Sequence, residues 1–186
     1  MPYTEWTSPP FITTDAEFRL WGKGISDALT AMGIPKSADT GQIDWTTVAK
    51  PPAVNTSQGY EIRYLNDSLH GTAPIYFKIE YGSENPASEP GIWMTTGTSS
   101  NGSGTIGGFG TPRSGAFMIT TSAASEMKGY LTVQDGGMAL ILSAVGGTGT
   151  ASLVIDNQGV DAVAQIDDVL SDQEFVVGQK VTLTVN

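Results

Sequence analysis

Cysteine is absent from this chain of 186 residues, and histidine occurs once, as His70. The lack of cysteine excludes a disulfide scaffold, a thiolate zinc site and a cysteine nucleophile. A single histidine excludes a cage of several histidines around a metal, and any Ser-His-Asp triad would depend on His70. No Gly-x-Ser-x-Gly, Walker or His-Glu-x-x-His motif occurs. We therefore expect no enzyme, and no catalytic, cofactor-binding or metal-ligating residue.

Basic residues are also scarce. Nine Lys and Arg stand against 19 Asp and Glu, which gives a net charge of −10. A field of this sign repels phosphate backbones, so nucleic acid is not an expected partner. Apolar runs fall far short of the ~20 residues that a membrane helix needs, so no membrane partner is expected. Residues 1–5 do not begin a basic and then apolar leader, so no secretion signal is expected.

Glycine and short alternating segments dominate what is present. The chain has 23 Gly and 10 Pro, and this composition favours many short strands joined by turns. We predict a mainly β fold, an antiparallel β-sandwich with a jelly-roll-like order. The predicted strands span residues 43–48, 60–64, 75–81, 91–97, 115–121, 130–134, 138–144, 152–156, 174–177 and 181–185.

The alternation within these segments predicts which side chains face a core. Tyr60, Ile62 and Tyr64 alternate with Glu61 and Arg63, as in a half-buried strand with its polar residues outward. Two glycine-rich turns, Asp135-Gly136-Gly137 and Gly146–Gly149, predict tight hairpins. Residues 96–110 are either a hairpin around Asn101-Gly102 or a long surface loop.

The first 35 residues differ from the rest. Residues 1–13 predict an extended arm that carries prolines and aromatic side chains. Thr14 to Glu17 form a capping box, and apolar residues then recur at helical spacing until Gly33 and Pro35 end the helix. Gly22 and Gly24 within it indicate either a closely packed neighbour or a bend. We divide the chain into an arm with an anchoring helix (1–35) and a β-sandwich body (36–186). The hypothetical interface residues are Trp6, Phe11, Phe18, Trp21, Ile25 and Leu29.

Two further features have a functional and a plainer interpretation. His70 follows Asp67 and Ser68, but neighbours in sequence rarely form a triad, so a surface histidine in a turn is the favoured interpretation. Residues 129–179 contain no Lys or Arg, and their seven acidic residues concentrate the negative charge. This segment could dock on a basic partner. Asp167, Asp168 and Asp172 could instead hold a cation, or the acids could simply be solvated.

Several stretches together resemble a known family. They are Phe18–Leu29, Asp39–Trp45, Gly59–Ile62, Asn66–Leu69 and Ala73–Gly82. Across residues 14–102 they resemble structural proteins of tailed bacteriophages, often labelled minor tail or virion structural proteins. The resemblance implies assembly into a particle in the host cytoplasm and brings no catalytic residues with it.

We therefore expect a non-enzymatic structural component of a phage particle, in the tail, neck or fibre. Its expected partners are other virion proteins and further copies of itself, with a trimer favoured. One alternative is a capsid decoration, or cement, protein. Another is a carbohydrate- or receptor-binding module that recognises a host surface glycan through exposed aromatic residues and the loops around residues 96–110.

Overall fold

The computed structural model describes residues 3–9, 12–83, 90–108, 126–145, 150–156 and 165–168. In these ranges it contains one helix, α1 (Asp15–Ala31), and ten strands. The strands are β1 (Tyr3–Ser8), β2 (Thr56–Tyr64), β3 (Tyr76–Ser83), β4 (Pro90–Gly97), β5 (Ser99–Ser100), β6 (Ile106–Gly107), β7 (Glu126–Gln134), β8 (Gly137–Val145), β9 (Thr150–Asp156) and β10 (Gln165–Asp168). The described residues include no helix long and apolar enough to cross a lipid bilayer.

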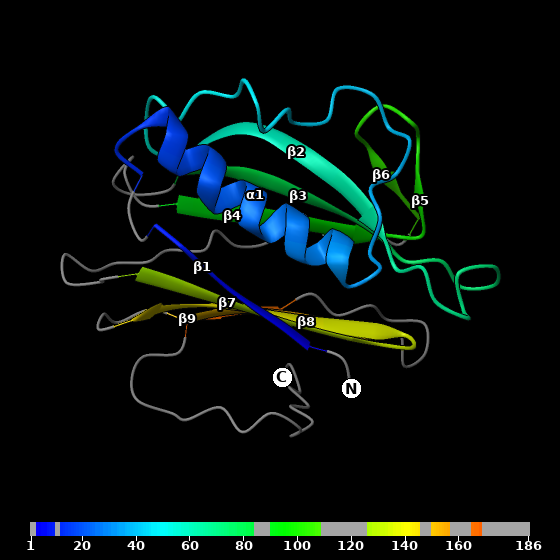
Figure 1. The fold of residues 1–186 in the computed structure, drawn as a ribbon. Coiled ribbons are helices and arrows are strands. Elements are labelled where there is room, and N and C mark those ends of the chain that lie inside the picture. The colour runs from blue at the N-terminus through cyan, green and yellow to red at the C-terminus, as the bar shows by residue number, and fades with distance from the viewer. Residues whose placement is uncertain are drawn as a thin grey trace.

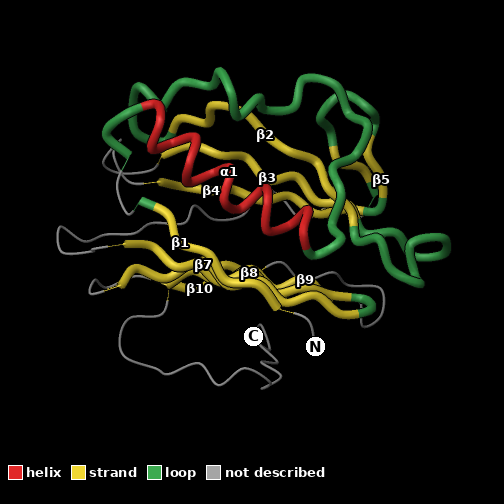
Figure 2. The backbone as a smooth tube through the Cα atoms, viewed as in Figure 1, coloured by secondary structure: helices red, strands yellow, loops and turns green. Residues whose placement is uncertain are grey.

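The described strands form two large antiparallel sheets and a small one. The first sheet has the order β1-β7-β8-β9-β10, the second β2-β3-β4, and β5 pairs with β6. The two large sheets lie over one another, and α1 runs along the side where β1 and β2 lie (Figures 1 and 2). The predicted mainly β fold is confirmed. Apart from β1 beside β7, neighbouring strands among those described are consecutive in the chain.

The helix begins and ends where the sequence indicates. Thr14 Oγ1 accepts the Glu17 amide, and the Glu17 carboxylate accepts from the Thr13 and Thr14 amides. The Thr13 hydroxyl also donates to this carboxylate. This bond first, and then those from the Thr13 and Thr14 amides, lower the pKa of Glu17 to about 2. At the other end Gly33 has a φ of +80°. There the Gly33 amide bonds the Thr30 carbonyl and the Ile34 amide bonds the Leu29 carbonyl, a Schellman motif.

The two glycines of α1 mark close packing against tryptophans. A Cβ atom at Gly22 would lie 2.0 Å from Cη2 of Trp45, and one at Gly24 would lie 2.9 Å from Cδ1 of Trp6. Both distances are too short for a side chain, so each tryptophan ring occupies the space that a Cβ would need. Of the two explanations for these glycines, the closely packed neighbour is confirmed.

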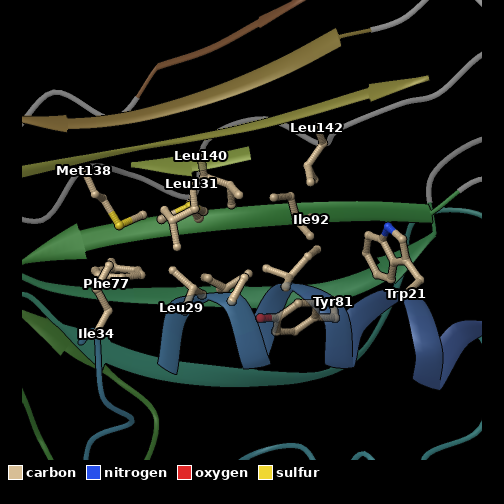
Figure 3. Close-up of a cluster of buried hydrophobic side chains, with 14 of the residues drawn as sticks. Trp21, Leu29, Ile34, Phe77, Tyr81, Ile92, Leu131, Met138, Leu140 and Leu142 are labelled. Atoms are coloured by element: carbon tan, nitrogen blue, oxygen red, sulfur yellow. The ribbon is translucent and has the colours of Figure 1, made fainter. Parts of the chain in front are cut away.

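One core joins the helix to both large sheets. The inner face of β3 contributes Phe77, Ile79 and Tyr81, which are 0% exposed. Leu131, Leu140 and Leu142 face them from the first sheet, while Trp21 and Leu29 approach from α1 (Figure 3). The ring of Tyr81 packs edge-on against Trp21 and Trp45, with centroids 6.0 and 4.8 Å apart. The helix is thus a part of the core itself.

Two predictions about local structure are wrong. Residues 43–48 form a turn because the Asp44 carboxylate accepts hydrogen bonds from the Thr46 amide and hydroxyl and from the Thr47 hydroxyl. On β2 the prediction is wrong for the charged residues: Glu61 and Arg63 are 0% exposed on the core face. Ile62 is buried as predicted, at 0% exposed, but on the other face, where Tyr60 and Tyr64 are half-buried. Pattern alone failed here because it assigns charged residues to solvent.

Two of the predicted turn segments fall within the described residues, and both form hairpins. The β7–β8 hairpin at Asp135-Gly136 is confirmed, with Gln134 opposite Gly137. The segment around Asn101 is a hairpin, in which the Asn101 amide bonds the Thr105 carbonyl between β5 and β6. The predicted turn at residues 146–149 and the predicted strands at 115–121, 174–177 and 181–185 lie outside the described residues.

The core face of β2 holds a buried ion pair. Arg63 Nε donates to Glu61 Oε2 at 2.9 Å, and both side chains are fully buried. Lys36 Nζ, on a side chain that is 36% exposed, lies 2.6 Å from Glu61 Oε1. Burying a charge costs several kcal/mol per ion unless partners surround it. This arrangement therefore requires further polar groups around the pair.

Those groups come from α1 and the segments around it. Glu61 accepts from Ser26 Oγ and Trp45 Nε1, each at 2.8 Å, and from Tyr81 Oη at 3.3 Å. The Arg63 guanidinium donates to the carbonyls of Ser26 and Ile34, at 2.9 and 2.6 Å. We call Ser26, Lys36, Trp45, Glu61, Arg63 and Tyr81 the buried network. It fastens α1 and the segment after it to β2.

The network also sets the ionisation of its members. Burial acts to raise the pKa of Glu61, but the charge of Arg63 and the hydrogen bonds from Lys36 and Trp45 outweigh it, and the pKa is lowered. Burial and then the charge of Glu61 raise the pKa of Tyr81 well above its usual value. Glu61 is thus held as a carboxylate and Tyr81 as a phenol that can donate to it.

We predict that Glu61→Gln lowers the free energy of unfolding by about 3–5 kcal/mol at pH 7, because it leaves Arg63 buried without its counter-charge. Urea unfolding followed by tryptophan fluorescence measures this. Because folding lowers the Glu61 pKa, the carboxylate stabilises the fold above the ordinary value of 4.5 and loses this effect as the pH falls through the folded-state pKa. The difference from wild type should therefore shrink in acid.

Asp27→Asn is the matched control, because Asp27 pairs with Lys23 on the exposed face of α1. Exposed pairs contribute little to stability. Equal effects of the two substitutions would contradict a stabilising role for the buried network.

Candidate functional site

The predicted interface residues of α1 lie inside the chain. Phe18, Trp21, Ile25 and Leu29 are each 0% exposed and belong to the core. They therefore line the chain's own core and not its surface, because the two sheets supply an apolar surface for the helix. Helical spacing shows that a stripe must be buried but not which molecule buries it. Phe11 lies outside the described residues.

Residues assigned to a separate arm and anchor are built into the body. β1 pairs with β7 over six residues, from Tyr3 opposite Thr132 to Ser8 opposite Met127. It is an edge strand of the first sheet, since among the described strands only β7 lies beside it. The structure thus joins residues 3–9 and α1 to the sandwich instead of leaving them as an appendage.

Trp6 is held between two glycines. It stands opposite Gly129 of β7, where a Cβ atom would lie 2.2 Å from Cε2 of the indole. Gly24 of α1 bounds the ring on another side. We call the space between Gly24 and Gly129 the Trp6 slot. Sequence reasoning missed Gly129, although a glycine between the inward-facing Met127 and Leu131 is the signal of a close approach to a strand.

The slot leaves two polar atoms of β1 unpaired. Trp6 Nε1 and Ser8 Oγ are both buried, and neither has a hydrogen-bond partner among the described residues. An unpaired buried donor or acceptor costs about 1–3 kcal/mol. β1 is therefore bound firmly by shape and by its ladder, but with two unmet polar groups.

The other face of β1 is open. Tyr3 is 54% exposed, and Glu5 lies 3.5 Å from Lys128 of β7 across the outer face of the sheet. The hydrogen bond to Glu5 and the charge of Glu5 raise the pKa of Lys128. The strand edge thus offers an exposed aromatic ring and a locally neutral charge pair.

His70 is not assembled into a triad with its neighbours in sequence. Its ring lies 4.7 Å from that of Tyr64 and 5.9 Å from that of Tyr76, and its Nδ1 is buried without a hydrogen-bond partner among the described residues. Ser68 and Asp67 instead bond to the β7–β8 turn. The structure therefore brings the three residues together in the loop but gives Ser68 and Asp67 other partners.

Those partners form a link between the two sheets. Ser68 donates to Asp135 twice, through its amide to Oδ1 at 3.0 Å and its hydroxyl to Oδ2 at 2.6 Å. In return Asp67 Oδ2 accepts the Gly136 amide at 2.9 Å. We call these four residues the latch. The sequence indicated Asp135 only as a turn residue, because pairing of two distant loops leaves no local pattern.

A second surface feature lies on the outer face of β2 and β3. Tyr64 and Tyr76 are paired across the two strands with ring centroids 5.6 Å apart, and His70 packs on both. Two residues later on the same face of β3, Lys78 Nζ lies 4.4 Å from the centre of the Tyr60 ring. All of these side chains are half-buried. We call Tyr64, His70 and Tyr76 the aromatic cluster.

The possible cation ligands fall largely outside the part of the chain whose side chains are described. Asp167 and Asp168 belong to β10, and Asp172 lies beyond it, outside the described residues. Among the described residues no group of three His, Asp or Glu side chains is placed to hold a metal ion.

We predict that Asp135→Asn weakens the latch and lowers the urea midpoint of unfolding at pH 7. The hydrogen bonds from Ser68 lower the pKa of Asp135. The carboxylate therefore stabilises the fold above its ordinary value of 3.8, and this contribution disappears as the pH falls through the folded-state pKa. The midpoints of wild type and variant should converge in acid, and a gap that stays constant down to pH 2.5 would refute the role of the carboxylate.

Comparison of the chain with protein-family models, with curated proteins and with solved structures finds no match. The function therefore has to be inferred from the chain's own residues. They offer an edge strand held in a glycine slot, an exposed tyrosine beside it, and an aromatic cluster on the opposite sheet.

Proposed function

We propose that this chain is a non-enzymatic structural component of a bacteriophage particle, in the tail, neck or fibre, that assembles by protein–protein contacts. The phage assignment is supported by the resemblance of residues 14–102 to virion structural proteins. The lack of cysteine suits a protein that folds in a reducing cytoplasm. The assembly role is supported by the geometry of β1.

The observation that carries the proposal is the position of β1 at a sheet edge. Edge strands expose unpaired backbone groups, and other chains can extend the sheet by pairing with them. Here the edge lies beside the exposed Tyr3 and the neutral Glu5–Lys128 pair. Aromatic residues are enriched in protein interfaces, whereas Lys and Glu are depleted at the centre and lie at the polar rim. Tyr3 therefore suits the centre of a contact, and the Glu5–Lys128 pair suits its rim. The edge of β1 thus has the composition of a contact surface.

Charge supports a basic partner elsewhere in the particle. The chain carries a net charge of −10, and seven acidic residues fall in the base-free segment 129–179. Opposite charges on two partners speed their encounter and fix their orientation. We therefore propose that the neighbouring virion protein presents a basic surface.

We predict that purified particles contain this chain at a fixed copy number. Tyr3→Ala should lower that number several-fold, because removing a buried interface aromatic costs more than about 1 kcal/mol. Quantitative mass spectrometry of gradient-purified particles measures the copy number of the wild-type chain and of the variant. Leu20→Ala is the matched control, since Leu20 is also exposed, at 61%, but lies on α1. Particles that lack the chain would refute the proposal, and cryo-electron microscopy would separate a tail, neck or fibre position from capsid decoration.

A carbohydrate- or receptor-binding module is the second candidate, and the aromatic cluster favours it. Tyrosine rings stack on the apolar faces of sugars, and Tyr64, Tyr76 and Tyr60 share one half-buried outer face with Lys78. A host surface glycan would lie across β2 and β3, on the sheet opposite to β1.

If this second candidate holds, the wild-type chain should bind a subset of glycans on an array, and Tyr76→Ala should abolish that binding. Tyr3→Ala should leave it unchanged, because Tyr3 lies on the other sheet. The absence of binding by the wild-type chain to any host glycan would exclude this function.

A further inference from the structure

We propose that β1 is exchanged between copies of this chain, so that Tyr3–Ser8 of one copy occupies the β7 edge and the Trp6 slot of a second copy. The inference rests on the proposed assembly function and adds to it a specific contact and a specific partner. Exchange of an identical element makes a dimer at low cost, because the contacts of the closed monomer are reused without change. The same operation can extend to a ring of subunits.

The position of β1 makes it separable from the body. It is the first strand, it lies at a sheet edge, and residues 9–14 alone connect it to α1. In the sequence this connection begins with Pro9 and Pro10. Proline fixes φ near −65° and favours extended backbone, so two consecutive prolines favour an extended connection over a tight turn. A connection of six residues reaches roughly 20 Å when extended.

The receiving site is specific for this strand. β7 pairs with β1 over six residues, and the register places Trp6 opposite Gly129. Because a Cβ at Gly129 would lie 2.2 Å from the indole, the slot is shaped for a large flat ring at this position. Lys128 adds a partner for Glu5. The occupant that satisfies all three conditions is the strand Tyr-Thr-Glu-Trp-Thr-Ser, so the partner is a second copy of this chain.

The unpaired atoms of β1 favour its release. Trp6 Nε1 and Ser8 Oγ are buried without hydrogen-bond partners among the described residues, and both regain water when the strand leaves the slot. This lowers the free energy needed to open the monomer. At the high local concentration within a growing particle, the strand of a neighbour then competes with the chain's own strand.

The absence of cysteine from the wild-type chain permits a direct test by disulfide trapping. One variant carries Glu5→Cys and a second, of different tagged mass, carries Tyr130→Cys, because these positions are opposite in the β1–β7 register. Opposed residues have Cβ atoms about 4.5–5.5 Å apart, close to the range of a disulfide. The two single-cysteine variants are mixed over a range of concentrations and oxidised gently.

Exchange predicts a disulfide-linked heterodimer of the two variants, at a yield that rises with concentration. Ile141→Cys replaces Tyr130→Cys in the control, since Ile141 lies one strand further from Glu5 in the same row. At two strand spacings, roughly 10 Å, a disulfide cannot form. A second control joins Glu5→Cys and Tyr130→Cys in one chain, which should close within the monomer at low concentration if the variants fold with the register described.

Failure of the mixed variants to cross-link, while the double variant closes within one chain, would overturn the exchange. Equal cross-linking through Ile141→Cys would do so as well, because it would indicate random collision. These results are independent of particle incorporation. If the chain is found in particles but does not cross-link, the proposed function stands and the exchange is refuted. If the chain cross-links but is missing from particles, the exchange stands and the proposed function is refuted.

Discussion

The buried pair of Glu61 and Arg63 is the interaction on which the rest of the structure depends. Two charges that are 0% exposed persist only if every polar group around them is in place. Ser26 must face β2, the indole of Trp45 must reach Glu61, and the carbonyl of Ile34 must reach Arg63. The pair thus fixes the rotation of α1 about its axis and the path of the chain after it.

The rotation of α1 also determines how β1 is held at the edge of the first sheet. With Ser26 turned toward Glu61, Gly22 lies against Trp45 and Gly24 lies against Trp6. Gly24 forms one wall of the slot that holds β1, so the buried network and the edge strand are connected through a single turn of helix. On the far side, the latch between Ser68 and Asp135 ties the β2–β3 loop to the β7–β8 turn. The two sheets are therefore joined both by the helix and by a polar link.

Local signals in the sequence were enough to place α1, because its cap, its apolar stripe and Gly33 all act within a few residues. The β7–β8 hairpin was predictable for the same reason, through Asp135-Gly136. The inward orientation of Glu61 and Arg63 was not, since burial of charge depends on hydrogen-bond partners that lie 16 to 37 residues away. The Trp6 slot likewise joins three segments, and only its two glycines, Gly24 in α1 and Gly129 in β7, hinted at it. Residues 43–48 have the composition of a strand but form a turn, because the hydrogen bonds that Asp44 accepts compete with β pairing. Composition does not reveal this competition.

The basic residues that are paired within the chain affect how two copies of it can associate. Lys36 and Arg63 serve the buried network, Lys23 pairs with Asp27, and Lys128 pairs with Glu5. With these basic groups engaged internally, two copies with a net charge of −10 each repel at long range. The proposed exchange opposes this repulsion locally, because the incoming strand brings one carboxylate, Glu5, and places it on Lys128 of the receiving copy. Salt would screen the repulsion between copies but would weaken docking on a basic neighbour. An acidic protein can thus bind a second copy of itself by strand exchange, which needs no oppositely charged surface. It can bind a different protein through its acidic surface, provided that the partner is basic.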